Sequence, residues 1–324
     1  MRQPEISCIL PTRNRAELLS LALSGIWRQS LPFDHFEIIV VDDGSTDATS
    51  EVVAAFERIL PLRLLRQAPS GIAAAKSLGV FAARAPIVLF MDDDDIPDSR
   101  MLEAHLDAHR RHPDLRTAIL GHTGLAPAPA RSPLMRYVTE VGCQLFAYPG
   151  LKAGEVLDYR GFWGGRSSCK RDFLLHRGLF NADFTFGCED VELGWRLQSF
   201  GLQVIYEPAA RATMLRTLDF DGFCNRSIRQ GRAQWRFHSL HQVPEIRSYC
   251  EIDSAAAAWA SDGPSYDRII REARRLDQTA AAYISRDVPL DSDFLSALNR
   301  SYERAFALSR ARGIAEARHQ AAQP

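Results

Sequence analysis

Three groups of acidic residues stand where carboxylates can do chemistry. The stretch LFMDDDDIPD places four aspartates, Asp92 to Asp95, directly behind an apolar run. Asp42 and Asp43 follow the apolar run IIVV in the same way, and Glu189 and Asp190 open the stretch EDVELGWRL. Carboxylate oxygens suit hard ions such as Mg²⁺ and Mn²⁺, and a carboxylate can also take the proton of an attacking hydroxyl group. The sequence therefore offers a cation site and a general base.

The first hundred residues contain the elements that must position these acids. Short apolar or β-branched runs predict strands at 6–10, 36–43, 62–67 and 86–91. Apolar residues at helical spacing predict helices between them, over 16–30, around 52–59 and over 71–85. This alternation predicts a parallel sheet with crossover helices, and ligands of such sheets bind at the carboxyl ends of the strands.

Polar residues gather where three of these strands end, at 11–15 (PTRNR), 42–47 (DDGSTD) and 92–95 (DDDD). Buried aspartates side by side are unstable unless a cation or hydrogen-bond donors compensate their charge, and a divalent ion is the simplest compensation. The alternative is a solvated acidic turn that caps the next helix through Asp98 and Ser99. For 42–47, one interpretation is a carboxylate that accepts from a nucleobase imide or a ribose hydroxyl, and the other is an ordinary strand-to-helix turn.

The second half is less regular. Residues 121–133 are rich in Gly, Ala and Pro and predict a loop or linker. A helix is expected over 191–200, ended by Gly201, with a strand over 202–207.

The sequence beyond about residue 245 predicts a helical tail. Phe294, Leu298, Tyr302 and Phe306 recur at four-residue spacing and form one apolar stripe. The spacing favours packing of this stripe on the core over a contact between two copies or with a membrane surface.

Composition excludes several classes of protein. The chain has 324 residues, with 39 basic against 40 acidic side chains, so no general positive field favours nucleic acid. No run approaches 18 apolar residues, which predicts a soluble or at most peripheral protein. The six cysteines are dispersed without a CxxC pair and are expected to be free thiols in a reducing cytoplasm.

Other motifs fail to appear. The sequence has no GxGxxG, Walker, GxSxG or HExxH pattern, so dehydrogenase, kinase, hydrolase and zinc-protease interpretations lose their main support. His105, His109 and His112 follow helical spacing beside Arg110 and Arg111, which favours a solvated helix face over a metal site.

Six stretches in order resemble the family 2 glycosyltransferases of the GT-A fold, over about residues 5–235. They are ILPTRNR, IIVVDDGSTD, PSGIAAAKSLGV, IVLFMDDDD, GFWGGRSSCKRD and GCEDVELGWRL. The resemblance implies an α/β fold with a Rossmann-like, mostly parallel central sheet flanked by helices. It implies a transferase domain at 1–240, divided into a nucleotide-binding half (1–98) and an acceptor-binding half (99–240), and a helical C-terminal extension at 241–324.

The resemblance also implies roles for individual residues. Asp43 falls at the acid that meets the uracil imide, and Lys76 falls where the family usually has an arginine beside the nucleotide. Asp92 would face the ribose, and Asp94 would bind a Mn²⁺ or Mg²⁺ ion that bridges the two phosphates. Asp190 falls at the catalytic base. The implied nucleotide-binding set is Pro11, Thr12, Arg15, Asp43, Gly71, Lys76, Asp92 and Asp93. The implied set for acceptor and donor sugar is Trp163, Gly164, Gly165, Arg166 and Glu189.

Two departures from the family pattern matter. Many members carry a histidine about two dozen residues after the acidic pair that completes the metal site, whereas this segment has Met214 and no histidine. Processive members carry a QxxRW element, but RQGRAQWRF has Gln230 and Trp235 at a different spacing. We therefore expect transfer of single sugars and a metal site without the histidine.

Together these features predict a metal-dependent, inverting glycosyltransferase that uses a nucleotide-sugar donor, with UDP favoured. The expected acceptor is a saccharide or lipid-linked saccharide in cell-envelope or exopolysaccharide synthesis. The expected location is the cytoplasm, with a peripheral membrane contact or a homodimer through the C-terminal helices as further options. Two alternatives stay open: a glycosyltransferase-like scaffold without turnover, and a sugar-1-phosphate nucleotidyltransferase, which is disfavoured because PTRNRAELL has no glycine-rich loop.

Overall fold

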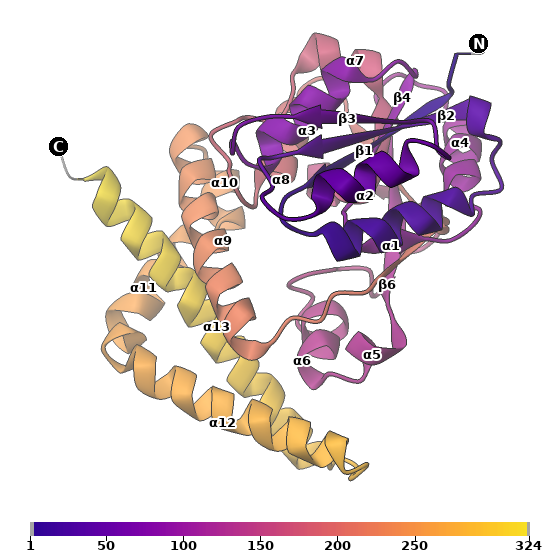
Figure 1. Ribbon diagram of the computed structural model, residues 1–324. Coiled ribbons are helices and arrows are strands. Elements are labelled where there is room, and N and C mark those ends of the chain that lie inside the picture. The colour runs from indigo at the N-terminus through magenta and orange to yellow at the C-terminus, as the bar shows by residue number, and fades with distance from the viewer. Residues whose placement is uncertain (1–2, 323–324) are drawn as a thin grey trace. The chain divides into compact units, whose positions relative to one another are not determined.

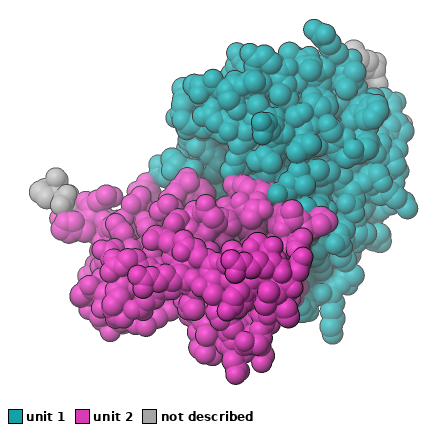
Figure 2. Space-filling view, turned by 60° about the horizontal axis from the view of Figure 1, so that its bottom comes forward, with its two compact units in different colours: residues 1–126, 150–185, 189–215 teal, residues 127–149, 186–188, 216–324 magenta. Residues whose placement is uncertain are grey.

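The structure is a computed structural model that describes residues 3–322. The chain divides into two compact units, which Figure 2 shows in different colours. Unit 1 comprises residues 1–126, 150–185 and 189–215, and unit 2 comprises residues 127–149, 186–188 and 216–324. The boundaries expected at residues 98 and 240 concern function and stay a prediction.

Unit 1 is built on one nine-stranded sheet with the order β3-β2-β1-β4-β8-β6-β9-β5, and β7 pairs with β9 (Figure 1). The strands are β1 (Ile6–Thr12), β2 (Phe36–Asp42), β3 (Leu62–Arg66), β4 (Ile87–Phe90), β5 (Asp95–Pro97), β6 (Thr117–Leu125), β7 (Val156–Leu157), β8 (Ser167–Lys170) and β9 (Gln203–Met214). The first four strands are parallel, as the sequence predicts, and β8 joins them in the antiparallel sense.

The parallel strands explain where the acids lie. All seven residues of β2 are buried, as expected for a strand that is covered on both faces. β1 pairs with β2 on one side and with β4 on the other, so the strand order reverses at β1. The crevice at such a reversal is where open α/β sheets bind ligands. The carboxyl ends of β1, β2 and β4 carry the three polar segments found in the sequence.

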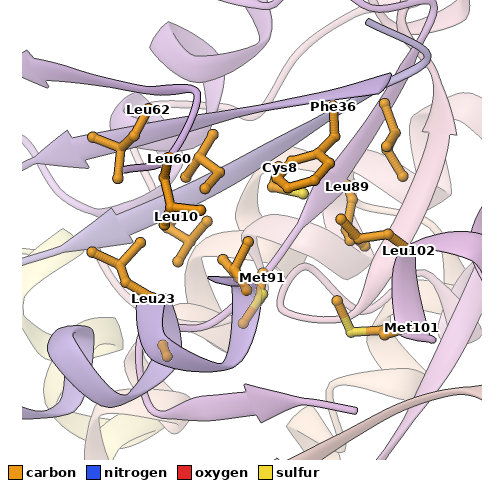
Figure 3. Packing of buried hydrophobic residues seen from close by; sticks show 14 of the residues in the cluster. Cys8, Leu10, Leu23, Phe36, Leu60, Leu62, Leu89, Met91, Met101 and Leu102 are labelled. Atoms are coloured by element: carbon orange, nitrogen blue, oxygen red, sulfur yellow. The ribbon is translucent and has the colours of Figure 1, made fainter. Parts of the chain in front are cut away.

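Helices cover this sheet. Those of unit 1 are α1 (Ala16–Trp27), η1 (Phe33–His35), α2 (Thr49–Phe56), α3 (Ile72–Ala82), α4 (Met101–Arg111), η3 (Tyr159–Gly161), α7 (Arg171–Arg177) and α8 (Glu189–Gln198). An apolar cluster joins one face of β1, β2 and β4 to α1 and α4, and Figure 3 shows Leu10, Leu23 and Leu102 among its members. Burial of this cluster fixes the strand ends against the helices.

The prediction of a loop or linker at 121–133 is wrong for residues 121–125. β6 continues to Leu125, and α5 (Pro127–Ala130) follows in unit 2. The pairing of β6 with β9 shifts register between Leu120 and His122, and a Cβ on Gly121 would lie 2.5 Å from the Ala210 carbonyl oxygen. Gly121 therefore marks a bulge where two backbones approach closely, not a turn.

The solvated face predicted for the α4 histidines is also wrong. His105 and His109 are 1% and 3% exposed, and both ring systems lie 2.9 Å from Ser168 Oγ of β8. Burial lowers the pKa of His105 to about 3 and that of His109 to about 2, so both rings are neutral. Lys170 Nζ donates to His109 Nδ1 at 2.6 Å. We refer to His105, Ser168, His109 and Lys170 as the histidine chain.

Unit 2 is helical in its described part. Its helices are α5, α6 (Pro133–Arg136), the π-helical turn η2 (Tyr137–Val141), α9 (Phe220–Leu240), α10 (Pro244–Tyr249), α11 (Ile252–Asp262), η4 (Gly263–Ser265), α12 (Tyr266–Ser285) and α13 (Ser292–Ala321). Between residues 3 and 322, no helix combines the length and apolar character that a membrane span requires.

The apolar stripe of the tail packs inside unit 2. Leu298, Tyr302 and Phe306 are fully buried with Phe220 and Phe223 of α9, and Phe294 packs at the edge of the same cluster. This packing is the outcome that the spacing favours.

Glycines allow α9 and α13 to approach closely. A Cβ on Gly231 would lie 2.1 Å from the Arg310 carbonyl oxygen, and one on Gly313 would lie 2.0 Å from the Ile228 carbonyl oxygen. The two helix backbones therefore meet where neither carries a side chain.

Candidate active site

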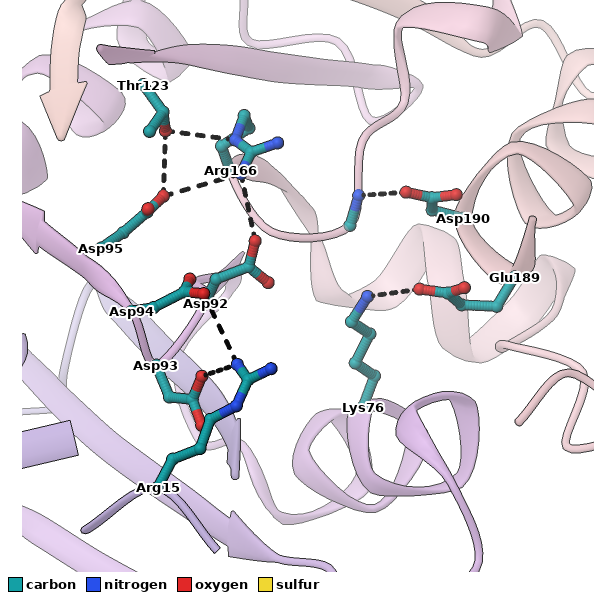
Figure 4. Close-up of polar contacts among 11 residues, drawn as sticks. Arg15, Lys76, Asp92, Asp93, Asp94, Asp95, Thr123, Arg166, Glu189 and Asp190 are labelled. Carbon is teal, nitrogen blue, oxygen red and sulfur yellow. Dashed lines mark hydrogen bonds and ion pairs between the residues drawn. The ribbon is translucent and has the colours of Figure 1, made fainter. Parts of the chain in front are cut away.

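The run of four aspartates ends β4 and meets two arginines (Figure 4). Arg15, directly after β1, donates from Nη1 to Asp93 Oδ1 at 2.7 Å and lies 3.5 Å from Asp94 Oδ2. Thr12 Oγ1 donates to Asp93 Oδ2 at 2.8 Å. Burial raises the pKa of Asp93 to about 6, although Arg15 and Thr12 act in the opposite direction.

Arg166 meets the same run from the segment before β8. Its Nη2 donates to Asp92 Oδ2 at 3.0 Å and lies 3.6 Å from Asp95 Oδ2, and its Nε donates to Thr123 Oγ1 at 3.1 Å. Thr123 in turn donates to Asp95 Oδ2 at 3.0 Å. Burial, with the charges of Asp92 and Asp94, raises the pKa of Asp95 to about 7 against the effect of Arg166.

These contacts decide between the two interpretations of the run. Asp93, Asp94 and Asp95 are at most 4% exposed, so the solvated acidic turn is wrong. The sequence alone predicts that a cation compensates the negative charge of these aspartates. In the structure two arginines supply part of this compensation. Asp92 is the most exposed of the four, with about a third of its side chain open to solvent. Four carboxylates against two guanidinium groups still leave an excess of buried negative charge.

The second acidic pair begins α8. Lys76 Nζ of α3 donates to Glu189 Oε1 at 2.8 Å and is 2% exposed, with the Phe180 ring 5.3 Å away. Burial alone would lower the pKa of Lys76, but Glu189, Asp190 and Asp92 raise it above its ordinary value. Lys76 therefore stays charged and forms a buried ion pair with Glu189.

Asp190 is held by two backbone groups. Its Oδ2 accepts from Gly164 N at 2.8 Å, and its Oδ1 accepts from Val191 N at 2.8 Å. Burial and the charge of Glu189 raise the pKa of Asp190, and Lys76 and the two N–H groups oppose that rise. A carboxylate with a raised pKa is a stronger proton acceptor.

The glycine pair 164–165 connects the two acidic groups. A Cβ on Gly164 would lie 2.4 Å from Lys76 Nζ, and one on Gly165 would lie 2.1 Å from Asp92 Oδ2. Asp92 N also donates to the Gly165 carbonyl oxygen at 3.2 Å. Only glycine fits at both positions, because the backbone passes directly beside the lysine ammonium and the aspartate carboxylate.

Asp43 forms a separate cluster with the loop before α3. Its Oδ1 accepts from Gln67 Nε2 and Ser70 N, both at 2.7 Å, and its Oδ2 accepts from Gly71 N at 3.0 Å. Gly71 has a φ of +92°, which favours glycine. Asp43 therefore joins the end of β2 to the start of α3.

The remaining predicted residues lie at the edges of the site. Pro11 pairs with Val41 in the β1–β2 register. Trp163 is partly buried, and its Nε1 donates to the Arg160 carbonyl oxygen at 2.6 Å.

Sequence reasoning missed Thr123 and Asn14. Thr123 lies in the segment that was interpreted as a linker. Asn14 has a φ of +53° and accepts from Thr46 N at 2.8 Å, which ties the loop after β1 to the loop after β2. The residue type offered one indication of this loop conformation, because asparagine adopts a positive φ more readily than most other residues.

The carboxylates fit one kind of metal site. In residues 3–322 no group of three or more His, Cys, Asp or Glu side chains could enclose an ion. Mg²⁺ is commonly held by only one or two carboxylates together with substrate phosphates. Asp95 Oδ1 is buried and accepts no hydrogen bond from the described residues, which adds to the excess of acceptors. The site therefore fits an ion that a diphosphate helps to hold, and not an ion held by protein ligands alone.

Comparison with known proteins matches the first part of the chain to a family. The model of the family "Glycosyl transferase family 2" matches residues 7–124. Validoxylamine A glucosyltransferase of Streptomyces hygroscopicus subsp. jinggangensis is 31% identical over 222 residues, which cover 61% of this chain and 52% of that protein. Chondroitin synthase of Escherichia coli is 27% identical over 226 residues, which cover 60% of this chain and 32% of that protein. The chain thus spans about half or less of the length of these curated relatives.

A solved structure shares the fold. The mannosyltransferase PcManGT of Pyrobaculum calidifontis, in complex with GDP-Man and Mn²⁺, has a TM-score of 0.61 and 19% identity, with coverage of 100% of this chain and 89% of that chain. The expected GT-A fold, including the long C-terminal helices, is confirmed. Residues 7–124 therefore match a glycosyl transferase family 2 domain, and the acidic strand ends and the glycine pair of the chain resemble those of that family.

Proposed function

We propose that the chain is a glycosyltransferase that moves a sugar from a nucleotide diphosphate donor to a hydroxyl acceptor, with inversion at the anomeric carbon. One observation carries the proposal. The glycine pair 164–165 lies against both Asp92, at the strand end where a donor is expected, and Asp190, the candidate base. A donor sugar and an acceptor hydroxyl bound beside this backbone would meet both carboxylates.

The nucleotide is assigned to the carboxyl ends of the first strands. Asp43, which accepts from Gly71 N, would offer carboxylate oxygens to an imide N–H, and Pro11 and Asp92 are assigned to the same nucleotide site, Asp92 toward the ribose. Thr12 and Arg15 hold Asp93, and Lys76 adds positive charge at the inner end of the site. We favour uridine as the base because of the family resemblance, and PcManGT with GDP-Man makes guanosine the competing base.

Asp190 is assigned as the base. The acceptor oxygen forms a bond to the anomeric carbon, the bond to the diphosphate oxygen breaks on the opposite face, and Asp190 takes the hydroxyl proton. The Gly164 and Val191 N–H groups orient its carboxylate, and Glu189 is kept in place by Lys76. Arg166 keeps Asp92 at the donor side, and Trp163 contributes an aromatic wall.

A divalent ion completes the proposal. Asp94 would hold Mn²⁺ or Mg²⁺ against the diphosphate, and such an ion would supply charge neutralisation for the leaving group. The Mn²⁺ in the complex of PcManGT supports this assignment. The acceptor is proposed to be a saccharide or a lipid-linked saccharide in cell-envelope or exopolysaccharide synthesis, because a polysaccharide synthase is among the relatives.

A donor panel tests the proposal. Release of nucleoside diphosphate would be measured with UDP-glucose, UDP-galactose, UDP-N-acetylglucosamine and GDP-mannose, each with Mn²⁺ and with EDTA. We expect release from one donor above all others, and its loss with EDTA. Binding of UDP or GDP without release from any donor, with a mixture of simple sugars as acceptors, would favour the scaffold alternative.

A further inference from the structure

Thr123 is a buried threonine of β6 whose hydroxyl group contacts both a carboxylate and a guanidinium group (Figure 4). Thr123 and Asp95 are each 1% exposed, and the hydroxyl group donates to Asp95 Oδ2 at 3.0 Å. Arg166 Nε donates to the same Thr123 Oγ1 at 3.1 Å. A guanidinium group accepts no hydrogen bond, so the Thr123 oxygen must accept from Arg166 and its proton must go to Asp95. The hydroxyl group therefore has one orientation.

The backbone of β6 brings Thr123 to Arg166. Leu120 pairs with Ser167 of β8. Gly121 N donates to the Arg166 carbonyl oxygen at 2.9 Å, which continues this ladder by one residue. The bulge at Gly121 follows, and a bulge commonly re-aims the side chains beside it. β6 thus holds Arg166 at two points, the carbonyl group through Gly121 and the side chain through Thr123.

Arg166 transfers this constraint to Asp92. Its Nη2 donates to Asp92 Oδ2 at 3.0 Å and lies 3.6 Å from Asp95 Oδ2. The N–H groups of a guanidinium form a rigid planar fork, so the fixed direction of Nε–H also fixes that of Nη2. About a third of the Asp92 side chain is open to solvent, whereas Asp95 is buried. The buried pair of Thr123 and Asp95 thus orients the more exposed carboxylate through the fork.

We infer that Thr123 is a positioning residue for Asp92 and acts on it through Arg166. This role rests on the proposed function, in which Asp92 faces the ribose of the donor. Without the hydroxyl group, the Arg166 Nε–H would lose this acceptor and the fork would be free to turn away from Asp92. Donor binding should then weaken, whereas the chemical step depends on Asp190 and should change little.

Three variants test this role. Thr123→Val keeps the shape of the side chain and removes the hydroxyl group, and Thr123→Ser keeps the hydroxyl group. Arg166→Lys keeps the positive charge and loses the fork. For each protein we would measure kcat and KM for the donor found in the panel, the Kd values for UDP and GDP with Mn²⁺ by titration calorimetry, and the melting temperature.

Thr117→Val is the matched control. Thr117 is also a buried threonine of β6, with 3% of its surface exposed, and it is the first residue of that strand. It pairs with Gln203 of β9, away from the aspartates. Its substitution removes a buried hydroxyl group from the same strand, so KM for the donor should stay within about twofold of the wild-type value.

We expect Thr123→Val to raise KM for the donor about tenfold while kcat stays within about twofold, because one hydrogen bond to a charged group is lost on the binding side. Thr123→Ser should return KM to within about twofold of wild type. Arg166→Lys should raise KM at least as much as Thr123→Val, since the fork itself is absent.

A double variant shows whether Thr123 acts through Arg166. If it does, adding Thr123→Val to Arg166→Lys should change KM by less than about twofold, because the fork is already lost. If the two residues act independently, their effects on KM should multiply.

Two results would overturn this role. One is a Thr123→Val protein with a lower melting temperature but a wild-type KM, which is the behaviour of a merely structural residue. The other is multiplication of the two effects in the double variant. Absence of turnover in the wild type with every donor would count against the proposed function instead, and the Kd values for UDP and GDP would then decide on Thr123. A wild type that binds neither nucleotide would overturn both.

Discussion

Unit 1 contains two buried polar networks that differ in kind. Each has a member in the segment 166–168. Arg166 reaches the aspartates after β4, whereas Ser168 joins His105 and His109 in the histidine chain. In the histidine chain donors and acceptors alternate from Lys170 to His105. Lys170 donates to His109 Nδ1, so His109 Nε2–H donates to Ser168 Oγ, and the Ser168 hydroxyl donates to His105 Nδ1.

Donors and acceptors do not alternate in this way in the aspartate network. Its acceptors outnumber its donors, burial raises the pKa of Asp93 and Asp95, and Asp95 Oδ1 accepts nothing from residues 3–322. Burial of polar groups therefore does not by itself mark a functional site. A functional site is indicated instead by an uncompensated excess of one charge that is open to solvent, here through Asp92, because a ligand of opposite charge can then compensate it.

Among the substitutions that compare the two networks, the largest effect is expected from Asp94→Asn. Loss of this carboxylate should lower turnover of the preferred donor on the order of 10²–10³-fold, because the charge that holds the ion and diphosphate is removed. The matched control is Asp98→Asn, an exposed aspartate four residues later, which should leave turnover unchanged. Equal turnover in Asp94→Asn and wild type, in the presence of Mn²⁺, would show that the aspartate network is no more important for turnover than the histidine chain.

A methyl group at Gly165 should have the next largest effect. In Gly165→Ala the added Cβ would lie 2.1 Å from Asp92 Oδ2, so the carboxylate or the backbone must move, and kcat/KM should fall by about 10–100-fold. In Gly124→Ala the new atom would lie 3.1 Å from the flexible end of the Arg211 side chain and 3.9 Å from His122 Nε2, and kinetics should stay near wild type. Steady-state kinetics on both variants would show whether close approach at Gly165 matters.

The histidine chain should affect the free energy of unfolding and the way in which it depends on pH. The pKa values of His105 and His109 are lowered in the folded state. The folded state is therefore most stable with respect to these two groups above their unfolded-state pKa of about 6.5, and it loses stability as the pH falls toward 3. The contribution of the two histidines to the free energy of unfolding should fall by up to about 2.7 kcal/mol per pH unit in that window, and the raised pKa values of Asp93 and Asp95 act in the opposite direction. Urea unfolding between pH 7 and 5 would measure the slope.

A substitution gives the control for this slope. His105→Gln should reduce the slope, whereas His176→Gln, at an exposed position, should not. An identical slope in His105→Gln and wild type would show that other groups cause the acid sensitivity.

The smallest effect on chemistry is expected from Ser168→Ala. Removing the hydroxyl leaves two histidine nitrogens, His109 Nε2 and His105 Nδ1, without this partner and should cost about 1–3 kcal/mol in the free energy of unfolding. Turnover should stay within about twofold of wild type, because the Ser168 hydroxyl bonds to His105 and His109, which lie outside the proposed site. A large loss of kcat without a loss of stability would mean that the histidine chain takes part in the reaction.

The sequence predicted the acids of the site but not their partners. Asp43 and Asp92 were identifiable because each ends an apolar, β-branched run, which is local information. The pairing of Arg166 with Asp92 joins residues 74 apart, and its contact with Thr123 spans 43 residues. Such pairs depend on how β6 and β8 enter the sheet, which no local pattern specifies.

The errors have similar causes. Gly121 was interpreted as part of a linker because a bulge glycine and a turn glycine look alike in sequence. His105 and His109 were assigned to a solvated face because Arg110 and Arg111 are adjacent, yet those arginines project from the other side of α4, where both are exposed. In both cases a tertiary contact outweighed the local composition.

The most direct test of the account is Asp190→Asn, measured for turnover and for UDP binding in parallel. The amide keeps the shape of the carboxylate but does not accept the hydroxyl proton, so kcat should fall about 10³-fold while the Kd for UDP stays within about twofold of wild type. Turnover equal to that of wild type would contradict the assignment of Asp190 as the base and, with it, the proposed mechanism.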